Sequence, residues 1–192
     1  MKSWGILALA VLMLPAAANA QSTESTPNPI TSLLKQQVVR YGKLQVEAAE
    51  DMPASKYTYR TTPQTRTFGE LIVHVTQFNE NICARVSGMT GPDIKDLKDT
   101  DSKEALVAAI KGSFDFCTKA LNGLDDSTLG LPAGKLGPNM LTRGGAIVIL
   151  GEDWFDHYGT MAIYLRLNGI LPPSARQSGM KDMKGMKGMK GM

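Results

Sequence analysis

The sequence predicts an all-α fold, a four-helix bundle, and three observations support it. Four segments place apolar residues at steps of three and four, the period of a helix that buries one face. No segment alternates apolar and polar residues as a half-buried strand does. Proline, glycine and polar residues separate the four segments, so four helices of comparable length are expected to pack around one core.

The first two helices are expected over residues 30–52 and 67–86. The first should end near Met52, because the following proline disfavours the α conformation of the residue before it. The second should begin at a capping box, in which Thr67 and Glu70 each accept a hydrogen bond from the backbone N–H of the other. The connections are longer than a hairpin bundle needs, so at least one should cross the length of the bundle.

The last two helices also have recognisable ends. The third should begin at Asp101, which can form a second capping box with Glu104, and it should end near Gly123. The fourth should follow Thr142 as its N-cap and end before Gly169, because glycine suits the position after a helix. The residues between these two helices are expected to form a long loop without secondary structure.

The chain begins with a segment typical of a secretory signal peptide. Residues 1–20 contain a lysine, an apolar run and an Ala-Asn-Ala cleavage site. The apolar run is shorter than the roughly 20 residues that span a membrane. We therefore expect an exported protein, periplasmic or extracellular, without a transmembrane segment. Residues 21–29 are interpreted as a polar linker, 30–175 as the helical bundle and 176–192 as a separate tail.

The charge distribution excludes one class of partner. The formal net charge is +3, from 21 Lys and Arg against 18 Asp and Glu. The tail after residue 180 and Lys2 account for this excess, so the body between them is close to neutral. A near-neutral body has no basic surface for nucleic acid, and we expect no nucleic-acid partner.

The tail repeats methionine every third residue, with glycine and lysine between. The repeat consists of Met180, Met183, Met186, Met189 and Met192. Such a segment cannot bury enough apolar area to fold alone. Thioethers are soft ligands that suit Cu(I), and they are also targets of oxidation. Copper binding, sacrificial oxidation and a flexible basic tail without a ligand remain alternatives for this segment.

Two cysteines lie on the second and third expected helices. An even number of cysteines in an exported protein favours a disulfide, here Cys83–Cys117. In the chain-entropy account, a closed loop of this length contributes about 4 kcal/mol to stability. The alternative is a pair of buried thiols that only pack against their neighbours.

A polar group interrupts the apolar faces of the second and fourth helices. His74 lies between apolar residues of one face, and Asp153 and His157 lie four residues apart on the other. Side chains four residues apart are neighbours on a helix and can bind one metal ion, with a third ligand from a facing helix. By spacing alone, the Asp–His pair is equally compatible with a structural hydrogen bond.

Two segments resemble motifs of the DinB/YfiT-like family. Residues 67–75 read TFGELIVHV, and residues 151–173 read GEDWFDHYGTMAIYLRLNGILPP. The resemblance implies an up-down-down-up bundle with a long second connection. It also implies a divalent metal held by three histidines, one on the second helix and two on the last. His74 and His157 match two of them, and Asp153 stands where the third is expected. Two histidines and one carboxylate also bind metals such as Zn²⁺ or Fe²⁺, and the resemblance leaves Zn²⁺, Ni²⁺ and Fe²⁺ as candidates.

The resemblance implies a metal-dependent enzyme, either a thiol-dependent transferase or a hydrolase. The expected partners are a small-molecule thiol or another small substrate, with a homodimer as the candidate assembly. The departure at Asp153 and the methionine repeat favour an alternative, a non-catalytic metal-binding or stress-associated envelope protein.

Overall fold

The computed structural model of the protein describes residues 25–176. The expected signal peptide and the methionine repeat lie outside the described residues. Within them, four helices dominate: α1 (Pro29–Asp51), α2 (Phe68–Ser87), α3 (Lys103–Asn122) and α4 (Arg143–Leu167). The prediction of an all-α four-helix bundle is confirmed.

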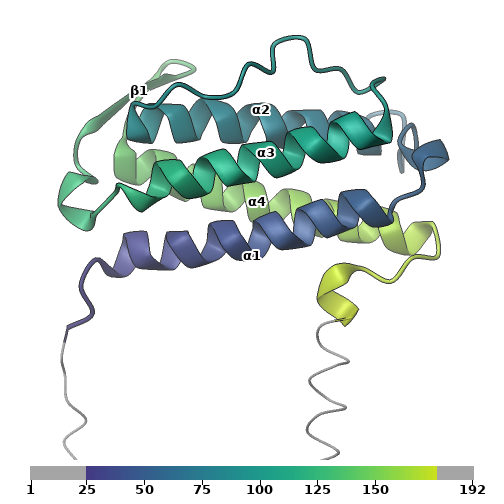
Figure 1. Ribbon diagram of the computed structural model, residues 1–192, viewed down its shortest axis with the longest axis horizontal. Helices are drawn as coiled ribbons and strands as arrows, with labels where there is room; N and C mark the ends of the chain where they lie inside the picture. The colour runs from purple at the N-terminus through teal and green to yellow at the C-terminus, as the bar shows by residue number, and fades with distance from the viewer. Residues whose placement is uncertain (1–24, 177–192) are drawn as a thin grey trace, which may run out of the picture.

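The four helices follow an up-down-down-up path (Figure 1). Helix α1 packs against α3 and α4, and α2 packs against the same two helices from the other side. The connection between α2 and α3 runs back along the length of the bundle, so these consecutive helices point the same way. This arrangement brings α2 beside α4, the two helices that carry His74 and His157.

The capping signals set the helix starts, with one correction. Glu70 Oε2 accepts a hydrogen bond from Thr67 N at 2.6 Å, and Thr67 Oγ1 accepts one from Glu70 N at 3.1 Å, so the capping box is confirmed. The prediction of Asp101 as the cap of α3 is wrong. Ser102 caps this helix, while Asp101 accepts a hydrogen bond from the Lys98 amide and closes the preceding turn.

The expected loop between α3 and α4 contains a small hairpin, which the sequence did not predict. Strands β1 (Pro132–Leu136) and β2 (Asn139–Thr142) pair antiparallel. Gly137, with a φ of 58°, adopts the left-handed conformation that the tight turn requires. The sequence of β1 does not resemble a strand, because it contains a proline, a glycine and a lysine. Its pairing with β2 is also irregular between Pro132 and Gly134.

Buried polar contacts fix the helices against one another at the level of the site. The Trp154 indole of α4 donates a hydrogen bond to Asn79 Oδ1 of α2 at 2.6 Å, and Asn79 donates one to Ser113 Oγ of α3. Gln45 of α1 donates to the backbone oxygen of Trp154 at 3.0 Å. All four residues are completely buried. Each helix therefore contributes to one network that sets the position of α4 in the bundle.

A disulfide adds a covalent connection between two of these helices. Cys83 of α2 and Cys117 of α3 are joined, with their Cα atoms 5.2 Å apart and both side chains completely buried. The pairing is the one that the sequence favoured.

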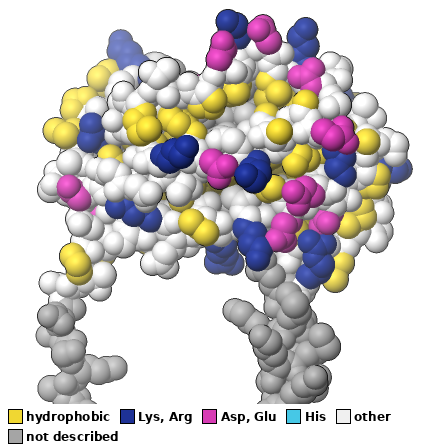
Figure 2. Space-filling model, viewed as in Figure 1, with side chains coloured by type: hydrophobic (Ala, Val, Ile, Leu, Met, Phe, Trp, Pro, Cys, Tyr) yellow, Lys and Arg dark blue, Asp and Glu magenta, His cyan; other side chains and the backbone are white. Residues whose placement is uncertain are grey.

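The surface of the bundle mixes both signs of charge. On the face drawn in Figure 2, lysine and arginine side chains alternate with aspartate and glutamate. None of the helices in residues 25–176 combines the length and the apolar character needed to cross a bilayer.

Candidate metal centre

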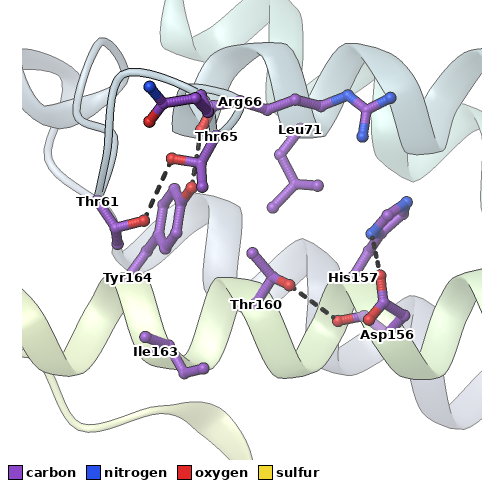
Figure 3. A pocket seen from close by; sticks show the side chains of 10 residues that line it. Thr61, Thr65, Arg66, Leu71, Asp156, His157, Thr160, Ile163 and Tyr164 are labelled. Carbon is purple, nitrogen blue, oxygen red and sulfur yellow. Dashed lines mark hydrogen bonds and ion pairs between the residues drawn. The ribbon is translucent and has the colours of Figure 1, made fainter.

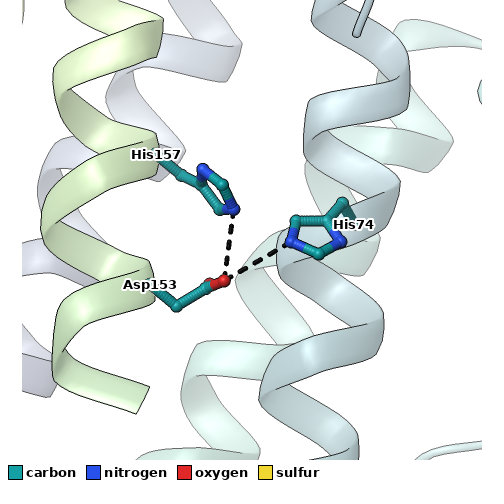
Figure 4. Close-up of side chains that lie close together, drawn as sticks. All are labelled: His74, Asp153 and His157. Atoms are coloured by element: carbon teal, nitrogen blue, oxygen red, sulfur yellow. Dashed lines mark ion pairs between the residues drawn. The ribbon is translucent and has the colours of Figure 1, made fainter. Parts of the chain in front are cut away.

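The three residues singled out in the sequence meet between α2 and α4 (Figure 4). His74 Nε2 lies 3.4 Å from Asp153 Oδ1, and His157 Nε2 lies 3.1 Å from the same oxygen. The three potential ligand atoms all lie within 4.8 Å of one another. Asp153 and His157 share a face because they are one helical turn apart. His74 reaches them because α2 packs against α4.

Burial leaves two polar atoms of this cluster without a hydrogen-bond partner among the described residues. The Asp153 side chain is 10 % exposed and that of His157 is 11 % exposed. Asp153 Oδ2 and His157 Nε2 are buried and have no hydrogen-bond partner among residues 25–176. The 3.1 Å approach of His157 Nε2 to Asp153 is thus a close contact that lacks hydrogen-bond alignment. Buried polar atoms without partners are costly, and a cation between them would satisfy them.

The carboxylate of the cluster is held in its ionised form. Burial alone would raise the pKa of Asp153, but the contacts with His157 and His74 outweigh it. The pKa of Asp153 therefore lies below its ordinary value. An ionised carboxylate is the form that binds a metal cation.

A second carboxylate orients one of the imidazoles. Asp156 Oδ2 lies 3.1 Å from His157 Nδ1, on the side of the ring away from Asp153. A carboxylate beside one ring nitrogen favours the tautomer that keeps its proton there, and it leaves the other nitrogen free as a ligand. His157 Nε2 is thereby presented to the point where Asp153 and His74 converge.

Two cavities reach the cluster, and both are bordered by the loop before α2. A cavity of about 630 Å³ is lined by His157, Asp156 and Leu71 together with the loop residues Thr61 and Arg66 (Figure 3). A second cavity, of about 480 Å³, is lined by His74 and by residues of the same loop. Small molecules can therefore approach both histidines.

The sequence interpretation missed the loop that borders these cavities. Arg66 lies directly before the capping box of α2, and Tyr164 lies on α4 two turns after His157. The Tyr164 hydroxyl donates a hydrogen bond to the backbone oxygen of Arg66 at 2.8 Å. The available signal was the position of Arg66 at the N-terminus of the helix that carries His74.

Solved structures with the same fold come from several bacteria. A DinB-like protein from Bacillus cereus superposes with a TM-score of 0.62 at 14 % identity, over 73 % of this chain and 93 % of that one. A DinB-like protein from Bacillus subtilis gives 0.57 at 15 % identity, over 71 % and 92 %. A conserved protein from Enterococcus faecalis gives 0.57 at 15 % identity, over 72 % and 96 %. At these identities the likeness shows the fold alone.

Sequence comparison gives the family directly. The comparison with curated proteins yields no match. The sequence profile of the DinB superfamily matches residues 39–161, a range that includes His74, Asp153 and His157. Because this range is more than half of the 192 residues, the chain belongs to the DinB superfamily.

Proposed function

We propose that this protein binds a divalent metal ion through His74, Asp153 and His157 and uses it in a metal-dependent reaction. The observation that carries the proposal is the convergence of three ligand atoms within 4.8 Å, two of them on side chains with unsatisfied buried atoms. Two histidines and one carboxylate are a ligand set for Zn²⁺ and for Fe²⁺, and imidazole also suits Ni²⁺.

The protein residues would divide the work of the site. Asp153 supplies the negative charge, and the two imidazoles supply neutral nitrogen ligands. Asp156, beside Nδ1 of His157, holds that ring in position. A divalent ion bound to three protein ligands lowers the pKa of a thiol or a water molecule and so supplies a nucleophile at neutral pH. A thiol-dependent transferase and a hydrolase are therefore the two reaction classes that we propose, acting on a small substrate in the adjoining cavity.

We place this activity outside the cytoplasm. Residues 1–20 carry the pattern of a secretory signal peptide. The Cys83–Cys117 disulfide suits the oxidising compartments in which such bonds persist. Amino-terminal sequencing of the exported protein should give Gln21 as its first residue, and retention of Met1 in a mature cytoplasmic protein would contradict export.

Metal analysis is the test of the proposed site. Protein purified without a histidine tag should bind about one Zn²⁺, Ni²⁺ or Fe²⁺ per chain in equilibrium dialysis. His74→Ala and His157→Ala should each weaken this binding. Asp115→Ala is the matched control, because Asp115 is an exposed carboxylate on α3 that pairs with Lys111, away from the cluster. Equal metal binding by wild type and both histidine variants would refute the assignment.

A non-catalytic role is the second candidate. The resemblance implies a histidine where this chain has Asp153, and the methionine repeat after residue 180 offers soft ligands for Cu(I). In this role the protein would bind metal in the envelope without turnover. Cu(I) binding that is lost when the chain ends at residue 176, with no effect of His74→Ala, would favour it. Turnover that depends on His74 would exclude it.

A further inference from the structure

One loop lines both cavities that reach the candidate metal centre. Gln64, Thr65 and Arg66 line both of them, with His157 in the first cavity and His74 in the second. In Figure 3 the Arg66 side chain runs along the first cavity, past Leu71, toward the end where His157 and Asp156 lie. A positively charged group thus shares a cavity with a proposed metal ligand.

The Arg66 guanidinium is an exposed positive charge at the first cavity. Within residues 25–176 it forms no hydrogen bond or ion pair. Asp156, the carboxylate that lines the same cavity, is occupied by His157 Nδ1 at 3.1 Å. Arg60, on the other side of the loop, is instead paired with Glu70 at 3.6 Å. An unpaired arginine in a cavity favours an anionic ligand, because the guanidinium fork matches a carboxylate with two parallel hydrogen bonds.

The second cavity does not favour an anion in the same way. Arg60 and Arg66 face it together with Glu70 and Asp99, so the full charges of its lining balance. The first cavity is lined by Arg66 and by one carboxylate, Asp156, which lies 3.1 Å from His157 Nδ1. The direction of the Arg66 side chain, toward the end of the first cavity where His157 lies, therefore assigns the anionic ligand to that cavity (Figure 3).

The backbone of the loop holds Arg66 in place. Its carbonyl oxygen accepts the hydrogen bond from Tyr164, which ties the loop to α4. Before it, Thr65 Oγ1 donates to the Thr62 backbone oxygen at 2.9 Å and lies 3.2 Å from Thr61 Oγ1. These hydrogen bonds fix the backbone from which the exposed Arg66 side chain extends.

We propose that Arg66 binds a carboxylate of the substrate, and that the other end of the same molecule reaches the metal centre. The carbon skeleton between them would lie against Leu71, Ile163 and Tyr164, which give the cavity its apolar wall. The substrate class is a small organic acid with an anionic group at one end and a metal-binding group at the other. This inference rests on the proposed metal function and adds the substrate class to it.

Dicarboxylates and their monoesters provide a direct test. Protein loaded with Co²⁺ is titrated at neutral pH with succinate, glutarate and adipate and with the monomethyl ester of each, followed by the visible absorption of the cobalt. At least one diacid should bind wild type about ten-fold or more tightly than its monoester, as a charge-assisted bidentate contact provides. The monoester keeps the metal-binding carboxylate and the chain, so the comparison isolates the second anionic group.

Substitution of the arginines assigns that preference to a residue. Arg66→Gln should remove the preference for the diacid and leave monoester binding within about two-fold of wild type. The Arg66 side chain has no hydrogen-bond or ion-pair partner within residues 25–176, so this variant should keep the melting temperature of the wild type. Arg60→Gln, the matched control on the other side of the loop, should keep the preference.

Three results would overturn the inference. They are equal binding of diacids and monoesters by wild type, a preference that survives in Arg66→Gln, and an equal loss in Arg60→Gln. Failure to retain cobalt would instead refute the metal centre itself, and this inference with it. Cobalt retention without any effect of Arg66→Gln would refute the inference alone.

Discussion

Replacement of Asp153 distinguishes a metal ligand from a structural hydrogen-bond acceptor. This carboxylate is nearly buried and lies within 3.4 Å of two imidazole nitrogens. If it binds metal, Asp153→Ala removes one of three ligands, and Asp153→His creates a three-nitrogen set that should retain Zn²⁺ or Ni²⁺. If it only accepts from the histidines, Asp153→Ala costs stability alone.

The two cases differ in how stability responds to metal. At a free metal concentration 100 times the dissociation constant, binding stabilises the wild type by about 2.7 kcal/mol. For a chain of this size that is about 5 to 11 °C in melting temperature. If loss of a ligand weakens binding by about 100-fold, the same metal concentration stabilises Asp153→Ala by only about 0.4 kcal/mol. Without metal, the same variant should lose about 1–3 kcal/mol, because the two imidazoles lose the buried carboxylate that lies within 3.4 Å of them.

The assay is thermal unfolding of each variant with a chelator and with added Zn²⁺ or Ni²⁺, together with metal content. Wild type and Asp153→His should show the metal-dependent increase in melting temperature, and Asp153→Ala should show little of it. Asp115→Ala, an exposed carboxylate on another helix, should behave as wild type. An Asp153→Ala variant that keeps the full metal-dependent increase would refute the ligand role. A wild type whose melting temperature does not respond to either metal would refute the centre.

Three further predictions concern the scaffold. Replacing both Cys83 and Cys117 with alanine should lower the free energy of unfolding by about 4 kcal/mol, since the bond closes a loop of 34 residue steps; an unchanged urea midpoint would contradict this. Burial, with Glu104 and Glu50 nearby, raises the pKa of Tyr57 well above 10. The native state therefore keeps a proton that the unfolded chain loses, and the free energy of unfolding should fall above about pH 10 by up to about 1.4 kcal/mol per pH unit. Tyr57→Phe should remove this part of the alkaline decline, and an identical decline would refute the assignment. Asn79→Ala should cost about 2–5 kcal/mol in urea unfolding, because it leaves the buried Trp154 indole without an acceptor and opens a cavity; a cost below about 1 kcal/mol would contradict the network.

Local chemistry explains how much of the fold could be read from the sequence. The start of α2 was predictable because Thr67 and Glu70 form a capping box within four residues. The start of α3 was misplaced by one residue because Asp101 and Ser102 are both good N-caps, and only the turn at Lys98 decides between them. The hairpin was missed because its two short strands have little apolar alternation, and their pairing depends on the turn at Gly137.

The candidate site divides in the same way between local and long-range information. The proximity of Asp153 and His157 follows from helical spacing alone. The proximity of His74 requires α2 to lie beside α4, which helical periodicity does not specify and which the family resemblance supplied. Arg66 was not singled out, because its position directly before the capping box of α2 is a weak signal for an arginine in a polar loop. The role proposed for Arg66 depends on two structural facts. Its backbone oxygen accepts a hydrogen bond from Tyr164, and its guanidinium has no partner within residues 25–176.

The scaffold contacts that position the site do not involve its proposed ligands. Asp153 precedes Trp154, whose indole is bonded to Asn79 of α2 and whose backbone oxygen accepts from Gln45 of α1. His74 lies on the same helix as Asn79, so one buried hydrogen bond sets the spacing of α2 and α4 close to the ligands. These contacts involve no metal ion, so we expect α2 and α4 to keep this spacing without one, in contrast to small zinc domains that are unfolded in its absence. The binding energy of a metal would then not be needed to bring the ligands together, because the helices already hold them close to one another.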